Sequence, residues 1–468
     1  MRAWLGELTH LYPAVRIVVT SRPAAAEANW LRAEGFSAAF LQPLSPADLR
    51  ALVEHWHAAI RDSDDLPCPP ERLPSYETKL LARLEAAPHL RTLASTPLLA
   101  ALLCALNLDR DTLPRDRMSL YRAAIDMLLE TRDTRRGIPS AQTTRLEPDQ
   151  KMRLLRDLAW HLSISARVEL PKPTARKLAA KQLAAMPRAQ ATPDKALDAL
   201  LQRSGIIREP VPGRIDFVHR TIQEYLTAQH AADIGDMDLL IRNANLDHWR
   251  ETIIMAAGHA DEPQRRELID GILGLAQRKR EPERQLKLLA IACLETLPSI
   301  PDDLHMALDQ CLDELIPPHD LDEVRALASA GEPVLRRLPA SLDGMSVREA
   351  EATVRTAWLI NGPESLDVLR QYTDSRPDVQ RELSTTWNYF DSFEYADRVG
   401  PPISRFTSQG SLTLDFLILY LLLRAFPLLP ARTSGTTHHY DARPRWSCWT
   451  WMAVANCAVW IISRPLGK

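Results

Sequence analysis

The spacing of apolar residues changes early in the chain, from a short α/β stretch to a long succession of helices. Residues 15–20 form a run rich in β-branched side chains, which predicts a buried parallel strand. Residues 2–11 place apolar side chains at helical spacing and predict a helix before that strand. A second β-like piece covers residues 38–41. Residues 1–43 are too few for a complete α/β domain, so we expect the chain to start in the middle of one.

From Ser45 onward the pattern becomes helical. Ser45 is suited to cap a helix and Pro46 to occupy its first position, and apolar residues then repeat with the period of a helix. After a polar, proline-rich loop the helical pattern resumes, and Pro97 opens a strongly apolar run. Residues 44–112 therefore predict a first helical domain.

A break in the helical pattern follows. Residues 204–209 and 214–218 read as two short strands joined by the turn sequence Pro-Val-Pro-Gly, which predicts a β-hairpin. Helices are expected on both sides of this hairpin. They cover residues 115–133, 147–165, 173–186, 193–203 and 219–233. Helices followed by a two-stranded wing are typical of a winged-helix domain, which we place at residues 113–233.

The C-terminal half divides into two regions of different character. Residues 236–400 predict helices of roughly 10–15 residues separated by prolines, without a strict repeat period, which favours an irregular HEAT-like stack of helices. Residues 401–468 are atypical, with only Asp415 and Asp441 as acids and several tryptophans near the end. We interpret this tail as disordered or out of reading frame. A membrane segment at 446–462 is less favoured because 17 residues are at the short limit for a span.

Charge and cysteine content exclude several classes of function. The 57 basic and 60 acidic residues give a formal net charge of -3, which offers no electrostatic basis for binding nucleic acid or an anionic membrane. The candidate recognition helix at 193–203 also carries mixed charge. None of the six cysteines forms a CxxC pair or a metal-ligand spacing, so no metal site is expected. Together with the lack of a signal-peptide pattern, this favours a cytoplasmic protein.

Three passages, taken in order, resemble the NACHT family of signal-transducing NTPases, which includes NOD-like immune receptors and bacterial defence proteins. The first is RIVVTSRP at residues 16–23, similar to the family's sensor strand and its arginine. The second is LASTPLLA at residues 93–100, similar to the family's first helical domain, which leads into the winged helix. The third is FVHRTIQEYLTA at residues 217–228, similar to the winged-helix signature. The resemblance implies a mainly α fold with a remnant of a P-loop NTPase sheet at the N-terminus.

The resemblance also implies a nucleotide pocket built from three residues. Arg22 would contact the γ-phosphate, Pro97 would lie against the adenine, and His219 would reach the β-phosphate of ADP. Exchange of ADP for ATP, with Mg²⁺, would then release the winged helix as a two-state switch. Without the resemblance, Arg22 reads as a strand-end cap, Pro97 as a helix-start residue and His219 as a structural histidine. Glu224 and Tyr225 are expected to pair or pack within the domain.

The chain departs from the family in one important respect. A P-loop needs GK[S/T], yet the only Gly-Lys pair is Gly467-Lys468, with nothing after it. We therefore expect an N-terminally truncated NACHT protein with no catalytic residues, which is not expected to bind nucleotide tightly or hydrolyse it alone. The favoured function is a regulatory switch in signalling, with self-association or an effector as partner. A helical protein-binding scaffold without a nucleotide role, and a non-functional gene fragment, remain as alternatives.

Overall fold

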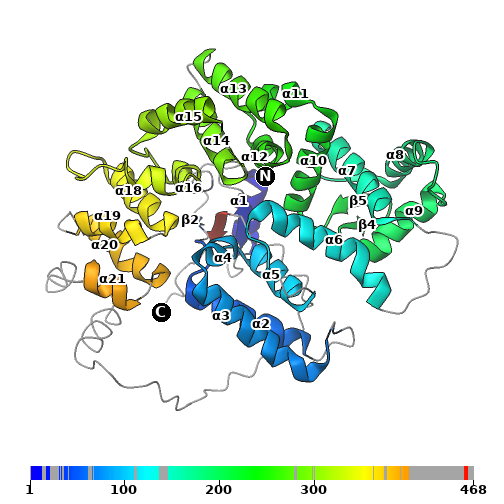
Figure 1. The fold of residues 1–468 in the computed structure, drawn as a ribbon, viewed down its shortest axis with the longest axis horizontal. Coiled ribbons are helices and arrows are strands. Elements are labelled where there is room, and N and C mark those ends of the chain that lie inside the picture. The colour runs from blue at the N-terminus through cyan, green and yellow to red at the C-terminus, as the bar shows by residue number, and fades with distance from the viewer. Residues whose placement is uncertain are drawn as a thin grey trace. The chain divides into compact units, whose positions relative to one another are not determined.

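The computed structural model describes the chain as two compact units, Met1–Arg115 with Cys448–Lys468, and Asp116–Ser447 (Figure 1). The described residues are 2–399 and 458–461, with gaps at 13–16, 22–30, 32, 34–35, 41, 62–65, 67, 110–112, 136–145, 279–281, 298, 300, 362, 374–376 and 391.

The first unit begins with α1 (Arg2–Leu11) and a small sheet. Strands β1 (Val18–Ser21) and β2 (Ser37–Phe40) both pair with β6 (Ala458–Ile461), in the order β1-β6-β2. Both ladders are antiparallel, so the expectation of a parallel strand next to its neighbour is wrong for this sheet. The reason is that a strand from the far end of the sequence lies between β1 and β2. That strand belongs to the segment 401–468 that the sequence sets apart as atypical; the rest of that segment lies outside the described residues.

The remainder of the first unit is helical, as the sequence predicts. Its helices are α2 (Pro46–Ile60), η3 (Pro70–Arg72), α3 (Leu73–Ala86), α4 (Pro88–Leu93) and α5 (Pro97–Asp109). Ser45 and Asp48 form a reciprocal capping box at the start of α2, which satisfies backbone N–H groups that a helix leaves unpaired there. In α5 nearly every side chain from Leu98 to Leu108 is buried, which is why its sequence reads as a continuous apolar run.

The second unit opens with a winged-helix domain that begins with α6 (Arg117–Arg135). The domain continues with α7 (Pro148–Ile164), β3 (Leu170–Pro171), α8 (Lys172–Ala184), α9 (Pro193–Ala199), η4 (Leu200–Ser204), β4 (Ile207–Val211), β5 (Arg214–Phe217) and α10 (Arg220–Ile234). Its sheet has the order β3-β5-β4 with antiparallel pairs, so the predicted hairpin is confirmed. Gly213 adopts φ +80° in the hairpin turn, a conformation that favours glycine. The two-residue strand β3 has no counterpart in the sequence prediction.

Short helices make up the rest of the second unit. They are α11 (Met237–Arg242), η5 (Asp247–Trp249), α12 (Arg250–His259), α13 (Glu262–Arg278), α14 (Glu283–Ala292), η6 (Cys293–Glu295), α15 (Asp302–Leu315), α16 (Leu321–Ser329), α17 (Glu332–Leu335), α18 (Val347–Ile360), α19 (Pro363–Gln371), α20 (Pro377–Thr386), η7 (Trp387–Tyr389) and α21 (Ser392–Arg398). Helices α12, α14, α16, α18 and α20 pack against one another in succession. Figure 1 shows this region as an arc of helices coloured from green to orange. This row of five helices confirms that the helices are stacked, while a HEAT-like repeat stays a prediction.

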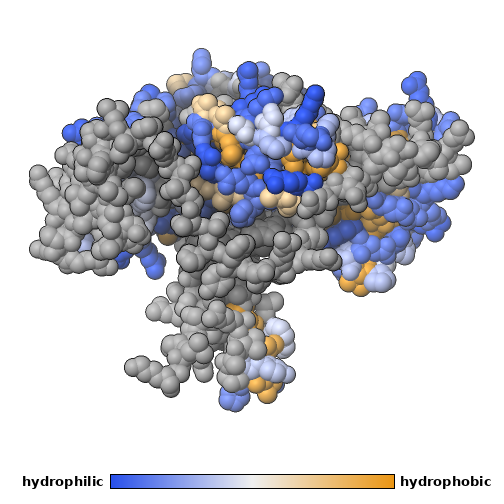
Figure 2. Space-filling model, turned by 90° about the horizontal axis from the view of Figure 1, so that it is seen from below, coloured by the Kyte–Doolittle hydropathy of each residue, from blue (hydrophilic) through white to orange (hydrophobic). Residues whose placement is uncertain are grey.

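The described surface is largely polar. On the face in Figure 2, hydrophilic side chains dominate the coloured residues, and hydrophobic ones form small groups between them. The large hydrophobic residues that are exposed come from separate elements, among them Trp4, Val168 and Met306. Among the described residues, no helix combines the length and the apolar character that crossing a bilayer requires.

Candidate functional site

His219 lies where the wing meets the long helix α10. It is the N-cap residue of α10, with an extended backbone (φ -133°, ψ 124°), and its carbonyl accepts the N–H of Ile222 at 3.1 Å. The residue before it is also fixed, because Val218 donates its N–H to the carbonyl of Ile206 at 2.9 Å. The backbone around the half-buried His219 side chain is therefore held from both the sheet and the helix.

The other two predicted nucleotide contacts lie in the first unit of the chain. Arg22 falls outside the described residues. Pro97 is the first residue of α5 and is partly buried. Pro97 and His219 belong to separate compact units. The convergence of Arg22, Pro97 and His219 on one nucleotide consequently stays a prediction.

The acidic and aromatic residues that follow His219 serve the packing of the domain, as predicted. Glu224 is only 3% exposed, and its carboxylate accepts a hydrogen bond from Nε of Arg220 at 3.0 Å. Tyr225 is 2% exposed and packs against Tyr121, with the two ring centroids 5.6 Å apart. Both residues therefore stabilise the first turns of α10.

A largely buried ion-pair cluster joins α6 to the helices that follow the winged helix. Nη2 of Arg117 donates to Oε2 of Glu251 on α12 at 2.7 Å, and Nη1 lies 3.6 Å from Oε2 of Glu295 in η6. The guanidinium also stacks over the ring of Tyr121, 5.6 Å from its centroid. Only 14% of the Arg117 side chain and 26% of the Glu251 side chain are exposed. The cluster thus ties α6 to α12 across 134 residues of sequence.

Arg117 favours the ionised form of Glu251. Burial by itself raises the pKa of Glu251, but the charge and hydrogen bond of Arg117 outweigh that effect, so the pKa of Glu251 lies below its ordinary value. Glu251 is therefore ionised at neutral pH. The opposite charges of Arg117 and Glu251 offset the cost of burying each of them.

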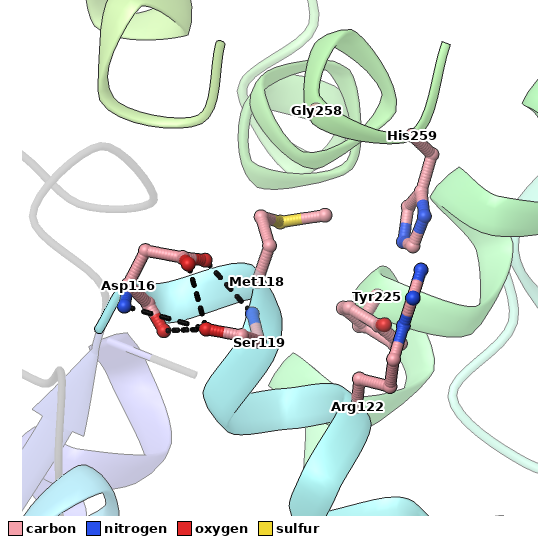
Figure 3. Close-up of a pocket in the computed structure, with 7 residues that line it drawn as sticks. All are labelled: Asp116, Met118, Ser119, Arg122, Tyr225, Gly258 and His259. Carbon is pink, nitrogen blue, oxygen red and sulfur yellow. Dashed lines mark hydrogen bonds between the residues drawn. The ribbon is translucent and has the colours of Figure 1, made fainter. Parts of the chain in front are cut away.

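A cavity of about 210 Å³ lies beside this cluster, between α6, α10 and α12. It is lined by Asp116, Met118, Ser119, Arg122, Tyr225, Gly258 and His259 (Figure 3). The side chains of Arg122 and His259 point toward one another beside Tyr225, and Asp116 lies on the other side of Met118. The cavity therefore has one cationic end and one acidic end, separated by an apolar wall.

The acidic end is occupied by a helix cap. Oδ1 of Asp116 accepts the N–H of Ser119 at 2.8 Å, and Oδ2 accepts the Ser119 hydroxyl at 2.6 Å. These bonds satisfy the first turn of α6, where the helix dipole also favours a negative charge. The carboxylate of Asp116 is in this way directed to its own helix.

The cationic end combines three hydrogen-bonding side chains. Burial raises the pKa of the Tyr225 hydroxyl above its ordinary value, although the nearby guanidinium of Arg122 acts to lower it. The His259 ring stacks edge-on against Tyr225 with centroids 4.7 Å apart. Among the described residues, Nε2 of His259 is shielded from solvent and has no hydrogen-bond partner. Leaving a buried polar atom unsatisfied costs about 1–3 kcal/mol.

Burial, together with the charges of Arg122 and Arg156, lowers the pKa of His259 to about 4. His259 is therefore a neutral imidazole at physiological pH. Arg117, Arg122 and His259 are not among the site residues that the sequence predicts. Nothing in the local pattern distinguishes them, since their partners are far away in the sequence. In the part of the chain that the structure describes, no group of three or more His, Cys, Asp and Glu side chains could hold a metal ion.

Comparison with protein families gives one match. Residues 117–231 match the model described as the winged helix-turn-helix domain C-terminal to NACHT. The matched segment runs from the first residue of α6 into α10, and it includes both the wing and His219. Comparison with curated protein sequences found no match. The family match, together with the wing and the helices around it, identifies residues 117–231 as a winged helix of the kind found C-terminal to NACHT domains.

Proposed function

We propose that this chain is the regulatory part of an ADP/ATP-controlled signalling switch, in which the winged helix reports the state of a bound nucleotide. The observation that carries the proposal is the position of His219 at the junction of β5 and α10, inside the segment that matches the family. The backbone at this junction is held by both a sheet and a helix. A hydrogen bond between His219 and a phosphate would therefore affect the position of the whole winged helix.

The chemistry of the proposed pocket uses one residue from each of three regions. The guanidinium of Arg22 would clamp the γ-phosphate of ATP with two hydrogen bonds, and Pro97 would offer an apolar surface to adenine. His219 would donate to the β-phosphate of ADP and hold the winged helix in the resting state. Replacement of ADP by ATP would change these contacts and release it, which is the differential affinity that a switch requires.

The proposal concerns binding and regulation and assigns no hydrolytic step. Residues 1–468 contain no GK[S/T] motif, whose backbone N–H groups and lysine would hold the phosphates. Mg²⁺ would accompany the nucleotide, as expected for the family. The proposed setting is cytoplasmic signalling, as in innate immunity or anti-phage defence, with self-association or an effector protein as the output.

The test compares thermal unfolding of the whole chain with and without ADP–Mg²⁺. At a ligand concentration ten times the dissociation constant, binding stabilises the folded state by about 1.4 kcal/mol. We expect wild type to show a saturable rise in melting temperature. His219→Ala is expected to need about tenfold more ADP for the same rise, because it loses a charge-assisted hydrogen bond.

His305→Ala provides the matched control, because His305 is a half-exposed histidine on α15. It should respond to ADP as wild type does. If ADP leaves wild type unchanged, or if His219→Ala responds like wild type, the nucleotide role of the winged helix is wrong. The alternative is then a helical protein-binding scaffold, which the row of helices α12, α14, α16, α18 and α20 supports.

A further inference from the structure

The cavity between α6, α10 and α12 has a cationic end, formed by Arg122, that could bind an anionic ligand. Arg122 lies at the cavity wall, near the hydroxyl of Tyr225. A guanidinium has five N–H donors arranged as a planar fork, so Arg122 can offer a pair of donors to an acceptor in the cavity even if another donor is used on Tyr225. The fork matches the two oxygens of a carboxylate in geometry and in charge.

His259 adds a second polar group to the same end. Its Nε2 atom is shielded from solvent and has no hydrogen-bond partner among the described residues, although it belongs to a side chain that lines the cavity. A bound oxyanion would give this atom a partner if Nε2 carries the ring proton and the neighbouring side chains shift to uncover it. Because its pKa is lowered to about 4, His259 contributes a hydrogen bond and no charge at neutral pH.

The charges around the cavity match a single negative charge. Among the lining residues, Arg122 is the only one that is permanently cationic, while Asp116 carries a negative charge beyond Met118. A second negative charge on the ligand would meet Asp116 rather than a cation. Inorganic phosphate, with close to two charges at neutral pH, fits this arrangement less well than a monocarboxylate.

The size and the wall of the cavity set the rest of the ligand. A volume of about 210 Å³ corresponds to roughly seven water-sized groups, each about 30 Å³. Met118 and the ring of Tyr225 give the cavity an apolar surface next to Arg122. That combination accommodates a short hydrocarbon body.

We propose that this cavity is a binding site for a small aliphatic monocarboxylate, held by Arg122 and His259. The ligand would contact α6 and α10 of the winged helix together with α12 beyond it. It would therefore stabilise the packing of the winged helix on the helices that follow. This role is separate from the proposed nucleotide switch, because none of the three proposed nucleotide contacts lines the cavity.

The experiment uses calorimetric titration of the whole chain with butyrate and with butyramide. Butyramide has the same shape without the charge, so it isolates the contribution of the guanidinium. We expect saturable, millimolar binding of butyrate, no measurable binding of butyramide, and weaker binding of inorganic phosphate than of butyrate. Acetate and pentanoate bracket the length of the hydrocarbon body.

Three variants make the assignment specific. Arg122→Gln is expected to weaken butyrate binding about tenfold to a hundredfold, because it removes a charge-assisted hydrogen bond. Arg122 is exposed, so its replacement should leave the fold intact, which circular dichroism checks. Arg122→Lys keeps the charge but loses the fork and should fall between wild type and Arg122→Gln. Arg336→Gln changes an exposed arginine remote in sequence and should bind butyrate as wild type does.

Several results would overturn the proposal. These are equal binding of butyrate and butyramide, no binding of any carboxylate in the series, unchanged binding by Arg122→Gln, or tighter binding of phosphate than of butyrate. Each of them can occur while ADP still stabilises the chain through His219. Failure of the carboxylate site is therefore distinguishable from failure of the nucleotide switch.

Discussion

Replacing Arg117 by alanine tests whether the winged helix is tied to the helices beyond it by the buried ion-pair cluster. The substitution removes the guanidinium that bonds Glu251 at 2.7 Å and approaches Glu295 at 3.6 Å. It leaves Glu251, with 26% of its side chain exposed, as an acid without its main partner. The variant therefore measures how much stability is lost when a buried carboxylate has no cationic partner, which is more than the loss of one contact.

The expected loss of stability follows from the burial of the pair. Breaking a buried ion pair by removing one partner costs about 3–5 kcal/mol, and surface pairs cost about 0–1 kcal/mol. Since 14% of Arg117 and 26% of Glu251 are exposed, water screens the remaining charge in part. We therefore expect a loss at the lower end of the buried range, about 3 kcal/mol.

Urea unfolding at pH 7, followed by circular dichroism, measures this loss. Arg336→Ala is the matched control, since its side chain is 67% exposed and its ion pairs are long, at 3.6 and 3.8 Å. It should change stability by less than about 0.5 kcal/mol. The double variant Arg117→Met/Glu251→Met removes both charges of the closer pair and should recover much of the loss, because the charge that remains, on Glu295, belongs to a side chain that is 39% exposed.

The pH dependence provides a second check with a definite sign. In wild type the pKa of Glu251 is lowered by Arg117, so its contribution is present above the ordinary glutamate pKa and is lost as pH falls through the lower folded value. Without Arg117, burial raises that pKa, and protonation then relieves the stranded charge. The difference between wild type and Arg117→Ala should consequently shrink from pH 7 to pH 5. A loss under about 1 kcal/mol at pH 7, or a difference that grows on acidification, would refute the reasoning.

Three further predictions concern the same region. A Cβ at Gly258 would lie 2.9 Å from Cβ of Thr296 and 3.0 Å from its carbonyl oxygen, so Gly258→Ala should lower the free energy of unfolding by about 1–3 kcal/mol in urea titrations. Because the pKa of His259 falls from 6.5 to about 4 on folding, the unfolded chain binds its proton first on acidification. Stability should fall by about 3 kcal/mol between pH 6.5 and 4, and His259→Gln should lose this part of the pH slope while keeping any slope due to other groups. Cys293 is fully buried and its thiol pKa is raised to about 12, so peptide mapping should find it unmodified by iodoacetamide at pH 8 until urea unfolds the chain; rapid labelling of the native protein would contradict its burial.

The sequence by itself determined the elements whose stability is local. The cap at Ser45, the apolar period of the helices and the turn residues around Gly213 are signals carried within a few positions of one another. The helices and the wing were therefore predictable, and with them the winged helix that the family match confirms. The position of His219 between strand and helix follows from the same local signals.

Tertiary structure alone decided which distant residues meet. The insertion of β6 between β1 and β2 brings together segments more than 400 positions apart, and it turned an expected parallel pairing into two antiparallel ones. Likewise, Arg117 finds Glu251 across 134 positions, and Arg122 shares a cavity with His259. Such contacts cannot be recognised from the pattern of either segment. A charged or polar side chain on a helix looks the same in the sequence whether it is exposed to solvent or paired with a distant residue. The local code thus specifies the winged helix, and only the packing of remote helices creates the ion-pair cluster and the cavity.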